Sequence, residues 1–287
     1  MEAKRINLEE WDYFGEGGSG KSYCNKKNGN ILLKLNGQDI PEETSFREFC
    51  SLKYFFENGL PVPEVYDFVT DGKCFGYTAQ RIKGKLSIAR ILSQEPDKTD
   101  MLAAAFAGHA LTLHSTDADE TKVSDAIAGY RELFGDLSFV PEDVAETVRR
   151  CLDGLVSRPT LLHGDMNPGN MISFEGRNYW IGVNDLKYGD PYLDIATMYV
   201  ICYCMSPKSV SRLYHASVRT FRKFFESFGK AYFGHSWNSS WVEHHIWNAV
   251  IVKCCALIKA NPKLASQYVP FIRGQKLLFS LRRLLAR

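Results

Sequence analysis

The stretch that decides the fold is residues 161–196, LLHGDMNPGNMISFEGRNYWIGVNDLKYGDPYLDIA, and within it HGDMNPGN at residues 163–170. Phosphoryl transfer to an alcohol needs a carboxylate close to the attacking hydroxyl, and Asp165 is placed to be that base. The reaction also needs Mg²⁺ across the phosphates, and the amide oxygen of Asn170 on the same loop is a hard ligand that suits this ion. A second carboxylate, Asp185, follows the next β-type run and completes a candidate metal site.

Upstream, residues 15–22 (GEGGSGKS) match the phosphate-binding pattern GxxxxGK[ST] letter for letter. In a P-loop protein a helix follows this pattern, because the helix N-terminus forms part of the anion site. Here YCNKKNGN follows, which is rich in turn-forming residues. The alternative is a glycine-rich hairpin that covers the nucleotide phosphates, with a strand on each side and a lysine on the next strand. We favour the hairpin, and a helix directly after Ser22 would contradict it.

A lysine and a glutamate follow in the order that this hairpin requires. Lys34 lies in the β-type run ILLKL, and Glu48 lies in a predicted helix at residues 44–58, where apolar residues recur at helical spacing. Glu48 is placed to hold the charge of Lys34, and Glu43 is a weaker candidate for the same task. Without the glycine-rich stretch, the lysine and the glutamate would be ordinary solvated charges.

The order of elements predicts a small β-rich lobe followed by a larger helical lobe. Residues 11–35 predict two strands around the turn KKNGN, and more β-type runs follow Gly59. Further on, the sequence predicts helices at residues 100–114 and 141–155, short strands at 170–174 and 179–183, and several helices from 192 to 287. We therefore predict an N-lobe at residues 1–82 and a helical C-lobe at residues 83–287.

The chain resembles the aminoglycoside phosphotransferase and choline kinase superfamily in its HGDMNPGN loop, the hairpin and aspartate after it, and GDPYLDIA at residues 189–196. The upstream order agrees: the glycine-rich stretch, the lysine, the glutamate, LPVP, QRIKGK and a helix ending in LTLH at His114. The likeness extends from Gly15 to about Ala196, and its most specific element is HGDxxxxN. It implies an α+β, protein-kinase-like bilobal fold with ATP and Mg²⁺ in the cleft between the lobes.

The resemblance implies a role for each matching position. Asp165 is the catalytic base or orients the hydroxyl, and Asn170 and Asp185 are the Mg²⁺ ligands. Lys34 contacts the α- and β-phosphates, with Glu48 behind it. The remaining nucleotide-binding positions are Gly15, Gly17, Gly18, Ser19 and Gly20 at the phosphates, and the backbone from Gln80 to Ile82 at the adenine.

Three further polar residues near the loop are expected to be structural. His163 is expected to brace the loop rather than take part in the chemistry. Asp190 and Asp194 are expected to cap and hold the helix that starts near Pro191.

Two departures from the superfamily pattern leave alternatives open. Asn184 precedes Asp185 where relatives usually have an apolar residue, and the connection from Asp185 to residues 189–191 is a few residues shorter than usual. A pseudokinase that binds nucleotide without turnover is therefore one alternative, and an antibiotic kinase of the aminoglycoside type is another. A protein substrate is a third alternative because protein kinases share the fold, but the short connection leaves no room for an activation segment.

Composition indicates an ordinary globular protein: 287 residues, 45% hydrophobic, 24% charged and a formal net charge of +2. This charge gives no reason to expect binding to nucleic acid or membrane. The eight cysteines form no CxxC pair, the N-terminus lacks the apolar run of a signal peptide, and no run of about 18 apolar residues occurs. We expect a cytoplasmic protein with reduced thiols, and the oligomeric state stays open.

The charge is unevenly distributed along the chain. Residues 196–287 contain fourteen lysine and arginine side chains against two carboxylates, Glu226 and Glu243, a formal charge of +12. A pocket for a polycationic aminoglycoside needs a surplus of carboxylates from this region. We therefore expect the acceptor to be the hydroxyl of a neutral or anionic small molecule, such as a sugar or sugar derivative.

Overall fold

The structure is a computed structural model that describes residues 2–17, 20–183, 185–234 and 239–274. Its contacts divide the chain into two compact units. The first unit comprises the residues up to Ile91 together with His163–Leu186, and the second comprises Leu92–Leu162 and the residues from Lys187 onward. The lobe boundary at residue 82 stays a prediction. The HGDMNPGN loop at residues 163–170, called the catalytic loop below for its predicted role, belongs to the first unit, as do all candidate site residues.

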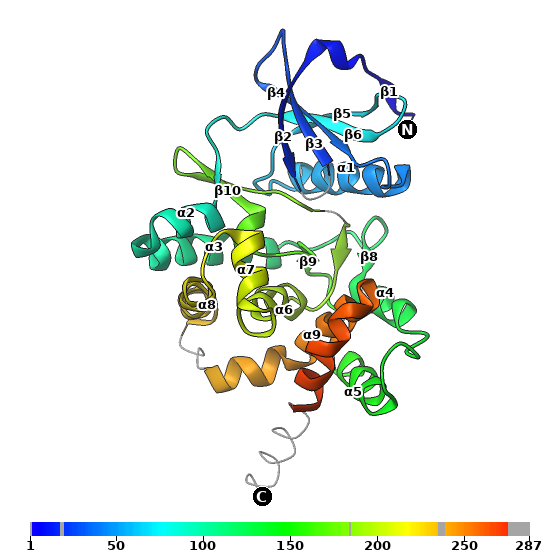
Figure 1. Cartoon of the computed structure of the whole chain (residues 1–287), viewed down its shortest axis with the longest axis vertical. Helices are drawn as coiled ribbons and strands as arrows, with labels where there is room; N and C mark the ends of the chain where they lie inside the picture. Colours follow the sequence, from blue (N-terminus) through cyan, green and yellow to red (C-terminus); the bar gives the residue numbers. More distant parts are fainter. Residues whose placement is uncertain (1, 18–19, 184, 235–238, 275–287) are drawn as a thin grey trace, which may run out of the picture. The chain divides into compact units, whose positions relative to one another are not determined.

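A six-stranded sheet forms most of the first unit (Figure 1). Its strands are β1 (Lys4–Arg5), β2 (Trp11–Gly17), β3 (Gly20–Asn25), β4 (Ile31–Asn36), β5 (Val65–Thr70) and β6 (Phe75–Gln80), in the spatial order β1-β5-β6-β4-β3-β2. β1 is parallel to β5, and the other neighbours are antiparallel. The turn between β3 and β4 forms because Oδ1 of Asn25 accepts hydrogen bonds from the backbone N–H groups of Lys27 and Asn28.

The glycine-rich stretch is a β-hairpin. β2 and β3 pair antiparallel through Gly17 and Gly20, and β3 continues through Ser22, so no helix follows there. The P-loop alternative is therefore wrong. The prediction of two strands for residues 11–35 is also wrong, because the chain reverses within the glycine-rich stretch and the range holds three strands. Gly18 and Ser19 lie outside the described residues.

Helix α1 (Glu42–Glu57) covers one face of this sheet (Figure 1). It begins two residues earlier than the predicted helix and follows Pro41, whose fixed φ suits a helix start. Its buried face carries Phe49, Leu52 and Phe55, and Phe49 packs against Phe68 of β5. This aromatic packing fixes α1 on the sheet, so the position of Glu48 relative to the strands is set by the core.

A second, three-stranded sheet in the first unit carries the segment that follows the catalytic loop. Its strands are β7 (Leu86–Ser87), β10 (Met171–Phe174) and β11 (Arg177–Trp180), in the order β11-β10-β7. β10 pairs antiparallel with both neighbours. The chain that leaves β6 is thereby tied to the strand that leaves the catalytic loop.

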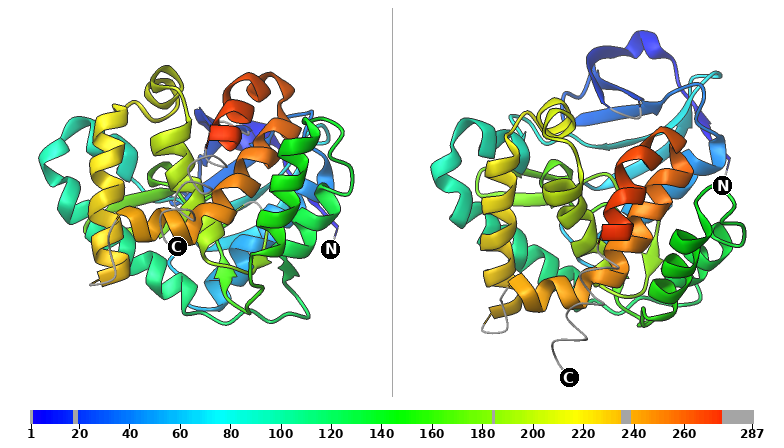
Figure 2. Two further views of the ribbon diagram at one scale, coloured as in Figure 1. Left: turned by 90° about the horizontal axis from the view of Figure 1, so that it is seen from below. Right: turned by 60° about the horizontal axis from the view of Figure 1, so that its bottom comes forward.

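The second unit is mainly helical (Figure 2). Its helices are α3 (Thr99–His114), α4 (Ala126–Leu133), α5 (Glu142–Asp153), α6 (Tyr192–Tyr199), α7 (Pro207–Tyr214), α8 (Val218–Phe233) and α9 (Ser239–Ala260), and the π-helical turn η4 (Val200–Cys204) follows α6. Helix α2 (Ile88–Gln94) contains the boundary between the two units. Helices α3 and α8 lie side by side, and Phe106 of α3 meets Phe224 and Phe228 of α8 edge to face. The short strands β8 (Ser124–Asp125), β9 (Leu161–Leu162) and β12 (Lys187–Tyr188) form a small sheet.

The α+β architecture, with a β-rich N-terminal sheet and a helical C-terminal part, confirms the predicted fold class. The predicted helices at 100–114 and 141–155 correspond to α3 and α5. Among the described helices, none is both long and apolar enough to span a bilayer.

All eight cysteines are free thiols. Burial raises the pKa of the Cys151 thiol to about 11 and that of Cys255 to about 12. These thiols stay protonated at neutral pH and fill the core as small apolar side chains.

Candidate functional site

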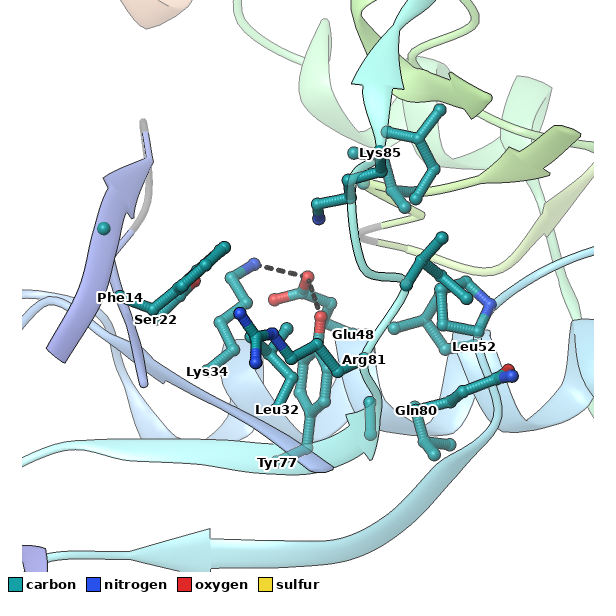
Figure 3. A pocket seen from close by; sticks show the side chains of 18 of the residues that line it. Phe14, Ser22, Leu32, Lys34, Glu48, Leu52, Tyr77, Gln80, Arg81 and Lys85 are labelled. Carbon is teal, nitrogen blue, oxygen red and sulfur yellow. Dashed lines mark hydrogen bonds and ion pairs between the residues drawn. The ribbon is translucent and has the colours of Figure 1, made fainter. Parts of the chain in front are cut away.

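A cavity of about 410 Å³ opens in the first unit between the glycine-rich hairpin, the end of β6 and the loop before β10 (Figure 3). This volume lies within the range of small-molecule sites. Its apolar walls include Leu32, Val65, Ala79, Ile172 and Ile181. Among the residues predicted to bind nucleotide or metal, the lining includes Gly15, Lys34, Glu48, Gln80, Ile82 and Asn170.

Lys34 and Glu48 both line this cavity and form an ion pair. Nζ of Lys34 lies 2.6 Å from Oε1 of Glu48, and the side chains are 19% and 5% exposed. Glu43, the weaker candidate, is exposed on the same helix. A pair that is this well shielded from water holds the lysine in one position, which an exposed pair would not do.

Two residues that sequence reasoning missed complete the surroundings of Glu48. The hydroxyl of Tyr77 donates to Oε1 of Glu48 at 3.0 Å, and Nδ2 of Asn36 lies 3.4 Å from Oε2. Burial, followed by the adjacent Glu48 carboxylate and this hydrogen bond, raises the pKa of Tyr77 well above its ordinary value. The hydroxyl therefore remains a donor, and the carboxylate is held on both oxygens.

The backbone at the end of β6 and just after it has a donor, the N–H of Ile82, with no backbone acceptor among the described residues. The N–H of Gln80 donates to the carbonyl of Glu64 at 2.7 Å, and the N–H of Arg81 donates to the carbonyl of Asn30 at 2.8 Å. Within the described part of the chain, the N–H of Ile82 makes no hydrogen bond to a backbone carbonyl. Ile82 itself is 8% exposed and lines the cavity together with Gln80.

The glycines of the hairpin differ in the space around them. Gly15 lines the cavity, and a Cβ atom there would meet nothing within 4 Å. A Cβ atom on Gly20 would lie 2.1 Å from the carbonyl oxygen of Leu35, so this position accepts no side chain without moving β4. Gly17 pairs with Gly20 across the hairpin.

His163 braces the catalytic loop, as expected. It is 1% exposed, its ring meets the Trp180 ring at 5.0 Å, and its Nδ1 lies 3.3 Å from the backbone N of Asp165. Because Nδ1 accepts this hydrogen bond, Nε2 carries the proton and donates to the carbonyl of Ile181 at 3.1 Å. Both ring nitrogens are therefore engaged in structure.

The Asp165 carboxylate is exposed but held by one asparagine on each oxygen. Nδ2 of Asn167 lies 3.1 Å from Oδ1, and Nδ2 of Asn170 lies 2.8 Å from Oδ2. Asn167 was missed by sequence reasoning, although its spacing permits the turn in which its Oδ1 accepts from the N–H of Gly169 at 2.8 Å. The pair of amides orients the carboxylate and leaves it accessible.

The oxygen of the Asn170 amide faces the cavity wall at Gly182. Since Nδ2 is bound to Asp165, Oδ1 is the atom left for another partner. A Cβ atom on Gly182 would lie 2.9 Å from this oxygen, and Gly182 has a φ of +72°, so this position favours glycine.

Asp185 follows Gly182 closely and returns to the catalytic loop. Its carbonyl oxygen lies 3.9 Å from the position of a Cβ atom on Gly164. The neighbouring Asn184 lies outside the described residues. Among those that are described, no three His, Cys, Asp or Glu side chains cluster as a metal site. An amide oxygen and one carboxylate nevertheless suit Mg²⁺, which takes one or two protein ligands and completes its shell with water and phosphate oxygens.

Asp190 and Asp194 have structural partners in the second unit, as expected. The carboxylate of Asp190 accepts from the N–H groups of Tyr192 at 3.0 Å and Val156 at 3.3 Å. Oδ2 of Asp194 lies 3.2 Å from Nε2 of His114. These contacts tie the start of α6 to its neighbours.

Comparison with solved structures gives the same fold. The chain is similar to aminoglycoside phosphotransferase APH(2'')-Ib with ADP bound (TM-score 0.57, 18% identity, 94% of this chain and 92% of that one). It is also similar to a choline/ethanolamine kinase family protein from Mesorhizobium loti (TM-score 0.54, 15% identity, 92% of this chain and 83% of that one). A third similar structure is amicoumacin kinase hAmiN in complex with AMP-PNP, Ca²⁺ and Ami (TM-score 0.54, 15% identity, 90% of this chain and 82% of that one).

A search of curated proteins by sequence returned no match. A model of the phosphotransferase enzyme family, by contrast, matches residues 13–225, which include the glycine-rich hairpin, the catalytic loop and most of the second unit's helices. Because this model matches about three quarters of the chain, the chain belongs to the phosphotransferase enzyme family (APH).

Proposed function

We propose that this protein is an ATP-dependent kinase that transfers the γ-phosphate to a hydroxyl of a small molecule. The observation that carries the proposal is the double use of Asn170, whose Nδ2 binds the Asp165 carboxylate while its Oδ1 remains beside the nucleotide-sized cavity. A base and a metal ligand are thereby linked through one side chain. Phosphoryl transfer needs these two groups at a fixed separation.

In the proposed reaction Asp165 orients the acceptor hydroxyl and takes its proton. The hydroxyl oxygen forms a bond to the γ-phosphorus while the bond between that phosphorus and the bridging oxygen breaks, and ADP leaves. Lys34, held by Glu48, neutralises charge on the α- and β-phosphates. Positioning and electrostatics supply most of the rate acceleration.

Asn170 and Asp185 would hold Mg²⁺, which neutralises phosphate charge when it is bound. The Asn170 amide is suited to this because the bond to Asp165 fixes which of its two ends faces outward. Asp185 brings the single carboxylate that a phosphate-bridging Mg²⁺ site typically uses. Both residues belong to the first unit, as does Lys34.

The apolar walls of the cavity suit the adenine base. The N–H of Ile82 is available to donate to a ring nitrogen, and the backbone from Gln80 to Ile82 borders the cavity. Gly15, Gly17, Gly18, Ser19 and Gly20 are proposed to cover the phosphates, as the hairpin between β2 and β3 supports. Reduced cysteines support a cytoplasmic location.

The acceptor is proposed to be a neutral or anionic sugar-like metabolite. The +12 charge of residues 196–287 opposes a polycation. An aminoglycoside-type antibiotic kinase is the first alternative, and it is favoured by the structural likeness to APH(2'')-Ib. A pseudokinase that binds nucleotide without turnover is the second, because the connection after Asp185 is short.

Incubation of the purified protein with ATP, Mg²⁺ and a metabolite extract, followed by mass spectrometry, separates these candidates. A phosphorylated neutral or anionic small molecule supports the proposal. Efficient phosphorylation of kanamycin or another aminoglycoside supports the first alternative. Nucleotide binding without transfer to any acceptor supports the second.

The variant Asp165→Asn tests the role of the base. We expect ATP consumption to fall by at least about 100-fold with little change in melting temperature, since Asp165 is exposed. Asp153→Asn is the matched control, because its side chain is 76% exposed at the end of α5. Unfolding of the Asp165→Asn protein would indicate a structural aspartate instead.

A further inference from the structure

Lys85 is a cation that lines the cavity and has no role in the proposed reaction as described above. It lies in the short connection between β6 and β7, where Gly84 has a φ of +68° and stands against the ring of Phe174. The next residue, Leu86, pairs with Ser173 of β10. The backbone of Lys85 is thus fixed on two sides, and Figure 3 shows its amine directed into the cavity toward Lys34 and Glu48.

The charges around the cavity are not balanced. Among the described residues that line it, three are cations, Lys34, Arg81 and Lys85, and one is a carboxylate, Glu48. That carboxylate is already paired with Lys34 at 2.6 Å. The lining therefore has a surplus of positive charge, which indicates an anionic ligand.

Arg81 is occupied with the hairpin. Its Nη1 lies 2.9 Å from Sγ of Cys24 and 3.1 Å from the carbonyl oxygen of Gly29, and its guanidinium stands 4.6 Å from the centre of the Phe14 ring. These contacts fix the guanidinium on strands β2 and β3. Arg81 therefore holds the hairpin in place through Nη1 and its contact with the Phe14 ring.

Lys85 has no such commitment. Among the described residues it makes no hydrogen bond and no ion pair, although it is only partly exposed. Burial, followed by repulsion from Lys34, lowers the pKa of its amine. An ammonium group that is partly desolvated beside another cation gains most from an anion that both can contact.

We infer that Lys85 is a second phosphate-binding cation, which clamps the polyphosphate of the nucleotide together with Lys34. This inference rests on the proposed function. Lys85 positions the phosphates and does not exchange a proton or form a bond in the reaction. The ligand that satisfies it is a nucleoside di- or triphosphate, because the same cavity offers apolar walls for a base and lies next to Asn170.

Calorimetric titration of three ligands tests the inference. Wild type, Lys85→Met and Lys83→Met are each titrated with ATP, ADP and adenosine in the presence of Mg²⁺. Methionine keeps the aliphatic stem and removes the charge. Lys83 is the matched control, because it is an exposed lysine of the same connection that does not line this cavity.

We expect Lys85→Met to weaken ATP binding by roughly tenfold, as for the loss of one charge-assisted hydrogen bond. Adenosine binding should stay unchanged, and Lys85→Arg should restore most of the affinity for ATP. In turnover, the KM for ATP should rise more than kcat falls. Equal weakening of adenosine and ATP, or no change in either, would overturn the inference.

A second measurement needs no variant. The wild-type protein is treated with an amine-reactive acetylating reagent, and acetylation at each lysine is measured by mass spectrometry. ATP should protect Lys85 and Lys34 but leave Lys83 reactive, whereas adenosine should protect none of the three. Reaction of Lys85 at the same rate with saturating ATP would refute the inference alone. Failure of the wild type to bind any nucleotide would refute the proposed function as well.

Discussion

Nδ2 of Asn170 donates a hydrogen bond of 2.8 Å to Oδ2 of Asp165. The same nitrogen lies 2.9 Å from the backbone carbonyl of Asp165, so a single amide holds both the carboxylate and its main chain. A charge-assisted bond of this kind fixes the rotamer of the exposed aspartate before any substrate arrives. The proposed base is therefore positioned by a proposed metal ligand.

Asn170→Asp should be more damaging than a change of one atom suggests. A carboxylate at residue 170 would stand about 2.8 Å from that of Asp165, and two like charges at this distance repel strongly. We expect kcat to fall by at least about 100-fold. Asn28→Asp is the control. Oδ1 of Asn28 accepts a hydrogen bond from the N–H of Asn30, and an aspartate oxygen can accept the same bond. Full activity of Asn170→Asp would contradict the proposed role of this amide.

Glu48→Gln should impair nucleotide use, whereas Glu43→Gln on the same helix should not. The first change removes the carboxylate that lies 2.6 Å from Lys34 and leaves the lysine only a neutral partner. We expect the KM for ATP to rise by roughly tenfold, the effect of about 1.4 kcal/mol. Steady-state kinetics at varied ATP concentration measure it. Similar KM values for the two variants would show that Lys34 does not depend on Glu48.

Tyr77→Phe should lower the free energy of unfolding at neutral pH. It should also remove the part of the alkaline pH dependence of that free energy that comes from the Tyr77 hydroxyl. The hydroxyl is buried and donates to a carboxylate, so its loss should cost about 1.5–3 kcal/mol of unfolding free energy. The folded-state pKa of Tyr77 lies above the unfolded value of 10.0. Stability from this group is therefore complete below pH 10.0 and declines as the pH rises above it.

Urea denaturation of wild type and Tyr77→Phe between neutral and alkaline pH checks both expectations. The difference in unfolding free energy between the two proteins should shrink above pH 10.0. A difference that stays constant would mean that Tyr77 ionises alike in both states.

Gly20→Ala and Gly15→Ala should differ in stability although both lie in the same hairpin. A methyl group on Gly20 would stand 2.1 Å from the carbonyl oxygen of Leu35, which belongs to a fixed strand. We expect a loss of about 1–3 kcal/mol or more. Gly15 has open space, so Gly15→Ala should leave the melting temperature nearly unchanged. Thermal unfolding measures both, and equal stability would show that β4 yields to the added methyl group.

The parts that sequence could predict are those in which local pattern and chemistry coincide. HGDMNPGN identifies Asp165 and Asn170 because their residue types and spacing follow from the reaction. The ion pair of Lys34 with Glu48 was predictable from the order of elements, and the two residues do meet. The roles of Asp165, Asn170 and Asp185 stay predictions until tested.

Other features depend on contacts between distant segments. Tyr77 reaches Glu48 across 29 positions of sequence, and nothing near either residue indicates this. Lys85 resembles any surface lysine until the pairing of β7 with β10 brings it to the cavity. The third strand within residues 11–35 was missed because glycines permit both an extended chain and a reversal.

The hairpin that borders the cavity lies at the edge of the six-stranded sheet. Its strand β2 is an edge strand, which pairs with β3 in this sheet. Opening only the tip of this hairpin, at Gly15 and Gly17, breaks a few β2–β3 backbone pairs and leaves Trp11 and Tyr23 packed against Leu33, Leu35 and Val69. Such local opening costs far less than global unfolding. A ligand can therefore enter and leave through local opening of the hairpin, without global unfolding. Substitutions in the hairpin can change the rate of ligand exchange without changing the free energy of global unfolding.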